Sequence, residues 1–331
     1  MRFLVLSSAL LLAGCATDLS GLEVLEGTGS DVEGKIFGGS PPNAPEHQAV
    51  VSLHTLSRGG RYVSVSPFCS GTLIAEDIVL TAGHCLEGTA ASKVAIYVGD
   101  DPSVDLVGNI YAVSEVMVHP SYDSRTIRND IALMRLATQV TSVTPVPNLP
   151  ASEGLTSADL GATINFAGFG TTESGTSGVK LQVDGTIDAA GCGVSGCPSA
   201  GDTATQFSYA QPHTGPCFGD SGGPAFITRT SGVYVAGLTS YGDSACAVYG
   251  VSTRTDAFDS FIDAFMGTSS VDTGLPPVTG DCGNGVCDEG ESCDGRDSTT
   301  ACADDCAGVT GGKPSKRYCE VGSSCEGAGC P

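Results

Sequence analysis

The sequence has few basic residues, no tryptophan and almost no long apolar stretch. It contains 15 Lys and Arg residues and 37 Asp and Glu residues, which gives a formal net charge of −22 at pH 7. Nucleic-acid binding through phosphates needs clustered Lys and Arg, so this charge argues against it. Beyond the first residues, no run approaches the roughly eighteen uninterrupted apolar residues of a membrane-spanning helix, and we expect no such helix there.

Cysteine, in contrast, is abundant. Fifteen cysteines are too many for a reducing cytosol without metal clusters, so we expect an oxidising compartment. The count is odd, so one thiol must be free, paired to another chain, removed or modified. The length of 331 residues suggests two domains, or one large β domain with an appendage, and 40% hydrophobic residues suffice for a packed core.

The N-terminal residues predict export. An apolar run over residues 3–13 is too short to span a bilayer and leads into Gly14-Cys15. The stretch Leu12-Ala13-Gly14-Cys15 resembles the lipobox of bacterial lipoproteins. That resemblance implies a signal peptide over 1–15 and a lipid on Cys15, which becomes the new N-terminus. The alternative is an ordinary signal peptide cut after Ala16.

Residues 36–267 have the pattern of an all-β domain. Short β-rich runs broken by Gly, Asn, Asp and Pro follow one another along the chain. Helical periodicity appears only at 256–266, where Phe258, Phe261 and Phe265 share one face with Ile262. We therefore expect an all-β domain closed by one C-terminal helix. The segment 16–35, with five acids and one lysine, is typical of a flexible leader.

The C-terminal region has a different composition. A linker rich in Ser, Thr, Gly and Pro spans 268–281, and eight cysteines crowd residues 282–331. This density indicates a small disulfide-stapled module with little apolar core of its own. Zinc is the competing interpretation, but this module contains no CxxC pair and no histidine. The disulfide connectivity is not readable from the sequence.

Three short segments carry the chemistry. They are TAGHC at 81–85, NDIAL at 129–133 and CFGDSGGP at 217–224. Alone, each has an ordinary structural interpretation: a packed histidine, a turn-forming aspartate or a tight glycine loop. Together, in the order His84, Asp130 and Ser221, they resemble the chymotrypsin-like serine peptidases.

The resemblance covers nearly all of residues 36–267. The stretch FCSGTLI at 68–74 is similar to the family's strand ahead of the histidine, and HPSY at 119–122 precedes the aspartate at the family's spacing. Phe169 and Tyr241 stand where many members have Trp. The resemblance implies two six-stranded antiparallel β-barrels with a short C-terminal helix.

The resemblance also implies a role for each site residue. His84 would accept the proton of the Ser221 hydroxyl, a poor nucleophile at neutral pH, while Asp130 holds the imidazole in the useful tautomer. The backbone N–H groups of Gly219 and Ser221 would face the developing oxyanion. The reaction that the resemblance implies is acyl transfer from a protein or peptide substrate to water, and it would need no metal or organic cofactor.

The stretch GKIFGG at 34–39 resembles the family's activation site. Cleavage after Lys35 would free the amine of Ile36, which pairs with Asp220 and orders the oxyanion loop and the specificity pocket. Residues 16–35 would then be a propeptide. The alternative is a lysine in a flexible loop before a strand.

By the same resemblance, the residue six before the serine lies at the base of the primary specificity pocket. Gly215 stands there, so a trypsin-type carboxylate is missing. The other implied pocket residues are Pro216, Ser240, Tyr241, Gly242 and Gly250. We expect an open, neutral pocket for a bulky apolar residue; an elastase-like preference for small residues is the alternative if Tyr249 or Phe218 folds into the space. A neutral pocket should not cut well after Lys35, so we expect a separate trypsin-like activating protease.

The remaining cysteines and acids complete the sequence-based expectations. The resemblance implies disulfides Cys69–Cys85 and Cys217–Cys246, while Cys192–Cys197 would be a local loop bridge that departs from the family's spacing. The odd cysteine is then Cys15, so one cut after Lys35 would both activate the enzyme and free it from a membrane. Structural calcium at acidic clusters, Asp100-Asp101 or those within 288–294, is less favoured than a solvated surface because no EF-hand pattern occurs.

We therefore expect a monomeric serine endopeptidase that is secreted, or held at the cell surface or outer membrane as a lipoprotein before activation. Two rival functions stay open. One is a catalytically silent family member used as a binding module, which the intact triad and Gly219 oppose. The other is an adhesin in which the cysteine-rich tail is the main functional part.

Overall fold

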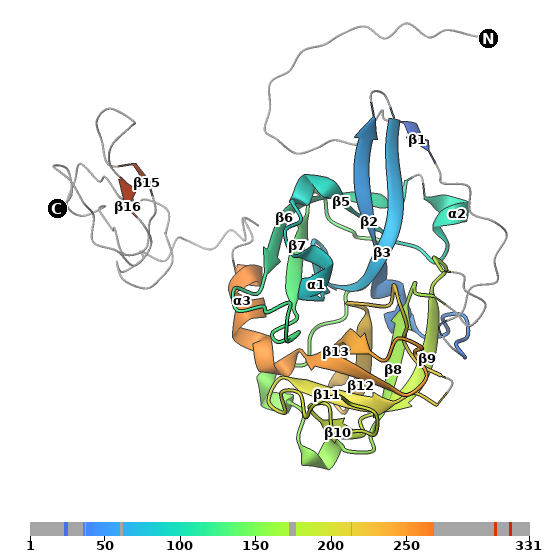
Figure 1. The fold of residues 1–331 in the computed structure, drawn as a ribbon. Helices are drawn as coiled ribbons and strands as arrows, with labels where there is room; N and C mark the ends of the chain where they lie inside the picture. Colours follow the sequence, from blue (N-terminus) through green and yellow to red (C-terminus); the bar gives the residue numbers. More distant parts are fainter. Residues whose placement is uncertain are drawn as a thin grey trace, which may run out of the picture. The chain divides into compact units, whose positions relative to one another are not determined.

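The structure is a computed structural model (Figure 1), and it describes most of residues 36–267. The described residues are 23–25, 36, 38–59, 62–106, 108–171, 177–212, 214–267, 308–309 and 318–319. The chain divides into two compact units, Met1–Thr268 and Ser269–Pro331. The expectations for Cys15, for Lys35 and for the pairing of the tail cysteines lie outside the described residues.

Six strands of the first sheet close into a barrel. They are β2 (Val50–Gly59), β3 (Tyr62–Ala75), β4 (Ile78–Thr81), β5 (Val94–Tyr97), β6 (Ile110–Val118) and β7 (Ala132–Leu136). Their hydrogen-bonded order is β3-β2-β5-β6-β7-β4, all antiparallel, and β4 pairs back to β3. The short strands β4 and β5 consist mainly of β-branched and apolar residues, which favour buried strands.

A seventh strand, β1 (Glu23–Leu25), pairs in parallel with β3, with Val24 opposite Val63. It lies in the segment for which the sequence predicts a flexible leader, so that prediction is wrong for these three residues. The reason is an unpaired edge. Strand β3 pairs with β4 only from Thr72 onward, which leaves the β3 backbone around Val63 available on that side.

The second sheet contains seven strands. They are β8 (Thr163–Gly168), β9 (Leu181–Thr186), β10 (Ala189–Ala190), β11 (Gln206–Ala210), β12 (Pro224–Arg229), β13 (Gly232–Gly242) and β14 (Tyr249–Arg254). Their order is β10-β11-β14-β13-β12-β8-β9, and every pair is antiparallel. The predicted all-β class, with two barrel-like sheets and a short C-terminal helix, is confirmed.

The strand count of the second sheet differs from the expected six because one segment breaks in two. Its edge strands β9 and β10 follow one another along the chain, separated only by Ile187 and Asp188. The Ile187 N–H donates to Ala162 O at 3.0 Å, whereas the Asp188 N–H donates to Ser208 O at 2.9 Å. The segment thus changes partner at this bend, leaving the β8 side for β11.

Helices are few and short. The α-helices are α1 (Gly83–Leu86), α2 (Pro102–Asp105) and α3 (Asp259–Gly267), and the 3-10 helices are η1 (Pro45–Ala49), η2 (Ala91–Lys93), η3 (Ala151–Glu153), η4 (Ser157–Asp159) and η5 (Asp256–Phe258). In the second unit, β15 (Gly308–Val309) pairs antiparallel with β16 (Tyr318–Cys319). Among the described residues, no helix is long and apolar enough to cross a membrane.

The larger apolar core fills the first barrel and extends to strands of the second sheet, a smaller core lies within the second sheet, and α3 packs on the first barrel. Leu53, Leu73 and Leu80 are fully buried in the first core. Phe166, Phe207 and Tyr209 gather in the second. The predicted helical face of α3 buries Ile262 and Phe265. The helix is docked by Arg135, whose guanidinium lies over the Phe265 ring and donates to Phe265 O at 2.7 Å.

A core truncation tests this packing. We expect Leu80→Ala to lower the free energy of unfolding by about 2–5 kcal/mol, because Leu80 is fully buried between β3 and β7 and its loss leaves a cavity. Val104→Ala is the control: Val104 is 79% exposed, so its change should stay within about 0.5 kcal/mol. Guanidinium unfolding followed by circular dichroism measures both, and equal losses would contradict the prediction.

Candidate active site

The His84 and Asp130 side chains form a pair at the edge of the first barrel. His84 belongs to α1, directly after β4, and Asp130 precedes β7, the strand that pairs with β4. The His84 Nδ1 atom lies 2.8 Å from Asp130 Oδ2, and the His84 side chain is 27% exposed while that of Asp130 is fully buried. Neighbouring strands of one sheet thus bring together two residues far apart in the sequence.

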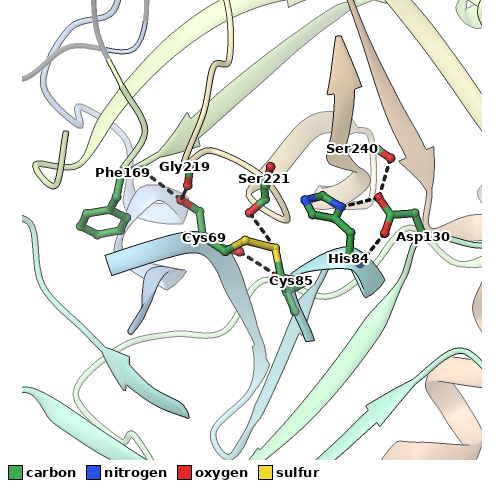
Figure 2. Close-up of a disulfide and its surroundings, with 10 residues drawn as sticks. Cys69, His84, Cys85, Asp130, Phe169, Gly219, Ser221 and Ser240 are labelled. Atoms are coloured by element: carbon green, nitrogen blue, oxygen red, sulfur yellow. Dashed lines mark hydrogen bonds and ion pairs between the residues drawn. A yellow bond between two sulfur atoms is a disulfide. The ribbon is translucent and has the colours of Figure 1, made fainter. Parts of the chain in front are cut away.

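The Asp130 carboxylate accepts three hydrogen bonds (Figure 2). The His84 backbone N–H donates to Oδ1 at 2.7 Å, and the Ser240 hydroxyl donates to Oδ2 at 2.5 Å, beside the bond from Nδ1. Donors on both oxygens hold the carboxylate in one orientation. Burial, together with the charge of Asp130, raises the pKa of nearby Tyr122 to about 12, so its phenol stays neutral.

Ser221 lies on the loop between β11 and β12, beside the His84 ring (Figure 2). The Ser221 carbonyl accepts the Ser70 N–H at 2.8 Å and lies 3.6 Å from Cys85 Sγ, which fixes the serine against the first barrel. Among the described contacts, no hydrogen bond joins the Ser221 hydroxyl to the His84 ring. Such bonds are often long in the absence of substrate.

Two glycines allow the loop that contains Ser221 to turn tightly. Gly222 has φ +77°, and a Cβ there would lie 2.0 Å from Thr81 Oγ1. Gly219 has φ +95°, and a Cβ there would lie 2.9 Å from Gly170 Cα. Both positions therefore require glycine for backbone conformation and for space. The Ser70 hydroxyl adds a tie, since it donates to Gly219 O at 2.9 Å.

Two backbone N–H groups at this turn, those of Gly219 and Ser221, lie on either side of Asp220 in the sequence. Within the described part of the chain, neither the Gly219 nor the Ser221 N–H donates a hydrogen bond. The carbonyls of the peptides that contain them are both held, by the Thr171 N–H at 2.6 Å and by the Gly223 N–H at 2.8 Å. Because the carbonyl and N–H of a trans peptide point in opposite directions, these bonds orient the two N–H groups.

The chain is similar in sequence to known proteases. The trypsin family model matches residues 36–262. Trypsin epsilon of Drosophila erecta is 31% identical over 72% of this chain and 89% of its own, and trypsin Blo t 3 of Blomia tropicalis is 29% identical over 79% and 97%. Melanization protease 1 of Drosophila melanogaster is 32% identical over 59% of this chain and 57% of its own.

The chain belongs to the trypsin family. It is a serine endopeptidase, as the sequence predicts.

Three disulfides connect the loops of this trypsin-family domain. They are Cys69–Cys85, Cys192–Cys197 and Cys217–Cys246, with S–S distances of 2.00, 2.01 and 2.14 Å. These are the pairs expected from the sequence, including the short Cys192–Cys197 loop. Cys69–Cys85 lies under Ser221 (Figure 2). His84 lies close to its two sulfurs, but sulfurs bonded to each other offer no thiolate to a metal.

Asp220, next to Ser221, is a buried carboxylate among N–H groups. Its Oδ1 accepts the Gly170 N–H at 2.8 Å and its Oδ2 accepts the Cys217 N–H at 2.9 Å. Burial raises the pKa of Asp220 from 3.8 to about 7 despite these two bonds. No ion pair involves Asp220 among the described residues.

Ile36, the residue after the predicted cut, is buried at the edge of the second barrel. Its side chain is 1% exposed, and its carbonyl accepts the Gly39 N–H at 2.5 Å. The chain then bridges to β9, where Ser40 and Gln182 exchange two backbone hydrogen bonds of 2.9 Å. Lys35 itself lies outside the described residues.

The predicted pocket residues come together, but the space is not as open as their glycines suggest. A Cβ on Gly215 would lie 2.2 Å from Gln211 Nε2, and one on Gly250 would lie 2.4 Å from the Tyr209 ring. Sequence reasoning missed Gln211 and Tyr209 because they align with no motif. The expectation that Gly250 leaves room for a large group is therefore wrong at that position.

A groove of about 190 Å³ lies on the other side of Gly219. Phe68, Phe169 and Phe218 line it together with Cys69. The Phe218 side chain is 63% exposed, so it lies at the surface rather than in the pocket where the elastase-like alternative would put it. Ser52, Thr171 and Ser177 also line the groove, so three aromatic rings and three hydroxyl groups lie beside Gly219.

The acidic residues considered for calcium have partners within the protein. Lys180 Nζ, which is 1% exposed, lies 3.0 Å from Asp100 Oδ1, and burial lowers its pKa despite that carboxylate. Asp101 Oδ1 accepts the Ser103 N–H at the start of α2, and Asp105 accepts the Tyr97 hydroxyl. Each of these contacts is made by one oxygen of its carboxylate. The acids within 288–294 lie outside the described residues.

The buried Asp220 predicts a pH dependence of the uncleaved protein. Its pKa is higher in the folded than in the unfolded state, so its stabilising effect is fully present below pH ~4 and is lost as the pH rises through about 7. The side chain of the Asp220→Asn variant cannot ionise, so this variant should not lose stability for this reason as the pH rises. We expect the melting temperature of the wild type to fall relative to the variant across this pH range. Parallel melting profiles would contradict the assignment.

Proposed function

We propose that His84, Asp130 and Ser221 are the catalytic triad of this endopeptidase. The observation that carries the proposal is the 2.8 Å His84–Asp130 contact beside Ser221. Because Nδ1–H is bound to the carboxylate, the other ring nitrogen, Nε2, is left to accept the serine proton. Ser240, reaching Asp130 from β13, supports this orientation.

The reaction proceeds through an acyl-enzyme. The Ser221 oxygen attacks the scissile carbonyl carbon while His84 takes its proton, which gives a tetrahedral intermediate. The imidazolium then protonates the leaving amine as the C–N bond breaks. Water attacks the ester with His84 again as base, and the acid product leaves as Ser221 regains its proton. The N–H groups of Gly219 and Ser221, which donate to no described residue, support a role as the oxyanion hole.

Substitution at Asp130 tests the triad. In the activated enzyme, Asp130→Asn should lower kcat by roughly 10⁴-fold because it favours the wrong imidazole tautomer. Asp263→Asn, at an exposed position of α3, is the control and should leave kcat within about twofold. Peptide hydrolysis at saturating substrate measures both, and a fluorophosphonate probe followed by peptide mapping should label Ser221. Labelling elsewhere would exclude Ser221 as nucleophile.

The proposal includes activation by cleavage between Lys35 and Ile36. Asp220 supports it: a carboxylate that is buried with two N–H donors and no cation in the described chain favours the arrival of a positive charge. The new Ile36 ammonium would supply that charge. It would lower the pKa of Asp220 and hold the loop that presents Gly219 and Ser221.

Blocking the cut tests this step. Lys35→Gln should resist an added trypsin-like protease at this bond and stay inactive, while Lys93→Gln, at an exposed position, should activate normally. Ile36→Gly should be cleaved yet lose most activity, because the side chain that is now buried would no longer anchor the new terminus.

With no carboxylate at Gly215, the purified wild type alone should remain uncut at Lys35. Full activity of uncleaved protein would refute the activation step.

Export completes the proposal. The three disulfides of the described chain support an oxidising compartment, either secreted or at the cell surface. If Cys15 carries a lipid, the cut after Lys35 also separates the protease from its membrane anchor. Release and activation would then be one event.

A further inference from the structure

The face of the second barrel that bears the pocket glycines also bears two large side chains. In the β11–β14 ladder Tyr209 lies opposite Gly250, and in the β13–β14 ladder Gly250 lies opposite Gly242. Directly opposed residues project from the same face of a sheet. Gln211 continues β11 with its N–H bonded to Val248 O at 3.0 Å, and as the second residue after Tyr209 it projects to that same face.

Gln211 fills the space above Gly215. A Cβ built on Gly215 would meet three atoms of the Gln211 side chain within 2.9 Å, and one on Gly242 would lie 3.5 Å from Gln211 Oε1. The amide is fixed, because Nε2 donates to Pro216 O at 2.8 Å and the side chain is 2% exposed. Gln211 thus lies between the expected base of the pocket and one of its walls.

Tyr209 fills the space beside Gly250. Its ring edge and hydroxyl lie 2.4–2.6 Å from the position of a Gly250 Cβ, and the ring packs 4.5 Å from that of Phe166, centroid to centroid. This contact with the barrel core leaves the ring little freedom to move aside. Burial raises the pKa of Tyr209, so the phenol is neutral at physiological pH.

Tyr249, suggested by the sequence as a blocking residue, belongs to the other face. It lies opposite Ala210 and next to Gly250 along β14, so its side chain points away from that of Tyr209. It packs instead with Cys192 and Val251. The glycines of the pocket therefore accommodate Gln211 and Tyr209, which take the volume that a long substrate side chain would need.

We propose that Gln211 and Tyr209 form a raised, neutral floor in the primary specificity pocket, so that this enzyme cuts after small uncharged residues such as Ala and Val. The inference rests on the proposed triad and pocket and specifies their substrate class. A Phe or Tyr side chain would overlap Gln211, and a Lys or Arg would find no carboxylate at Gly215. The nearby Asp243 carboxylate is engaged by backbone N–H groups of Ala245, Ala247, Val248 and Tyr249.

The test compares peptide substrates that differ only in the residue before the scissile bond. Full-length protein, cut after Lys35 by a trypsin-like protease that is then removed, is assayed on otherwise identical peptides with Ala, Val, Phe or Lys at that place. We expect kcat/KM for Ala to exceed that for Phe and for Lys by on the order of 100-fold. Similar or higher values for Phe or Lys would overturn the proposal.

Two pairs of variants assign the preference to the floor. Gln211→Ala should lower the Ala-to-Phe ratio at least about tenfold by opening space, whereas Gln211→Met, of similar length, should keep it. Tyr209→Ala should also lower the ratio, whereas Tyr209→Phe, which keeps the ring, should not. An unchanged ratio in Gln211→Ala would exclude this residue from the floor.

Active-site labelling separates failure of this inference from failure of the proposed function. Each preparation is titrated with a fluorophosphonate, and rates are divided by the labelled fraction, so a variant that folds poorly still reports its preference. If activated wild type is not labelled at Ser221, the proposed triad fails. If Ser221 is labelled but Phe or Lys is preferred, the triad stands and only the raised floor is refuted.

Discussion

The hydrogen bonds to the buried Asp130 carboxylate are the interactions on which the rest of the site depends. The carboxylate comes from the first barrel and holds His84 of the same barrel through two hydrogen bonds, while Ser240 reaches it from the second barrel. A charge removed from water needs donors around it, and here those donors come from both halves of the fold. Correct solvation of one carboxylate therefore requires that the two barrels meet in one relative position.

Asp220 is a second buried carboxylate, and it has fewer hydrogen-bond donors than Asp130. Asp130 has three donors, one of them an imidazole that can become positively charged, whereas Asp220 has two backbone N–H groups. Its pKa is accordingly raised by burial to about 7. The two acids divide the labour of the proposed mechanism: one orients the base, and the other makes the loop around Ser221 sensitive to a new positive charge.

Much of this arrangement is predictable from the sequence, because short motifs encode local geometry that the chemistry requires. The motifs around His84, Asp130 and Ser221 predict both the barrels and the site, and the apolar face of α3 predicts the closing helix. The pocket floor is not predictable in the same way. Gln211 belongs to no motif. Gly250 predicts empty space when only the sequence is considered, whereas the strand pairing of the folded sheet places Tyr209 opposite it. Strand β1 was missed because an unpaired β3 edge is a property of the folded sheet.

The bridge between Ser40 and Gln182 has a consequence for solubility. Strand β9 is an edge of the second sheet, and unpaired edges are places where another chain can add by hydrogen bonding. The segment that begins at Ile36 covers part of this edge. The stretch that would become the new N-terminus thus also protects this edge from edge-to-edge aggregation. A terminus that failed to dock would leave the unpaired backbone groups of β9 exposed to other chains.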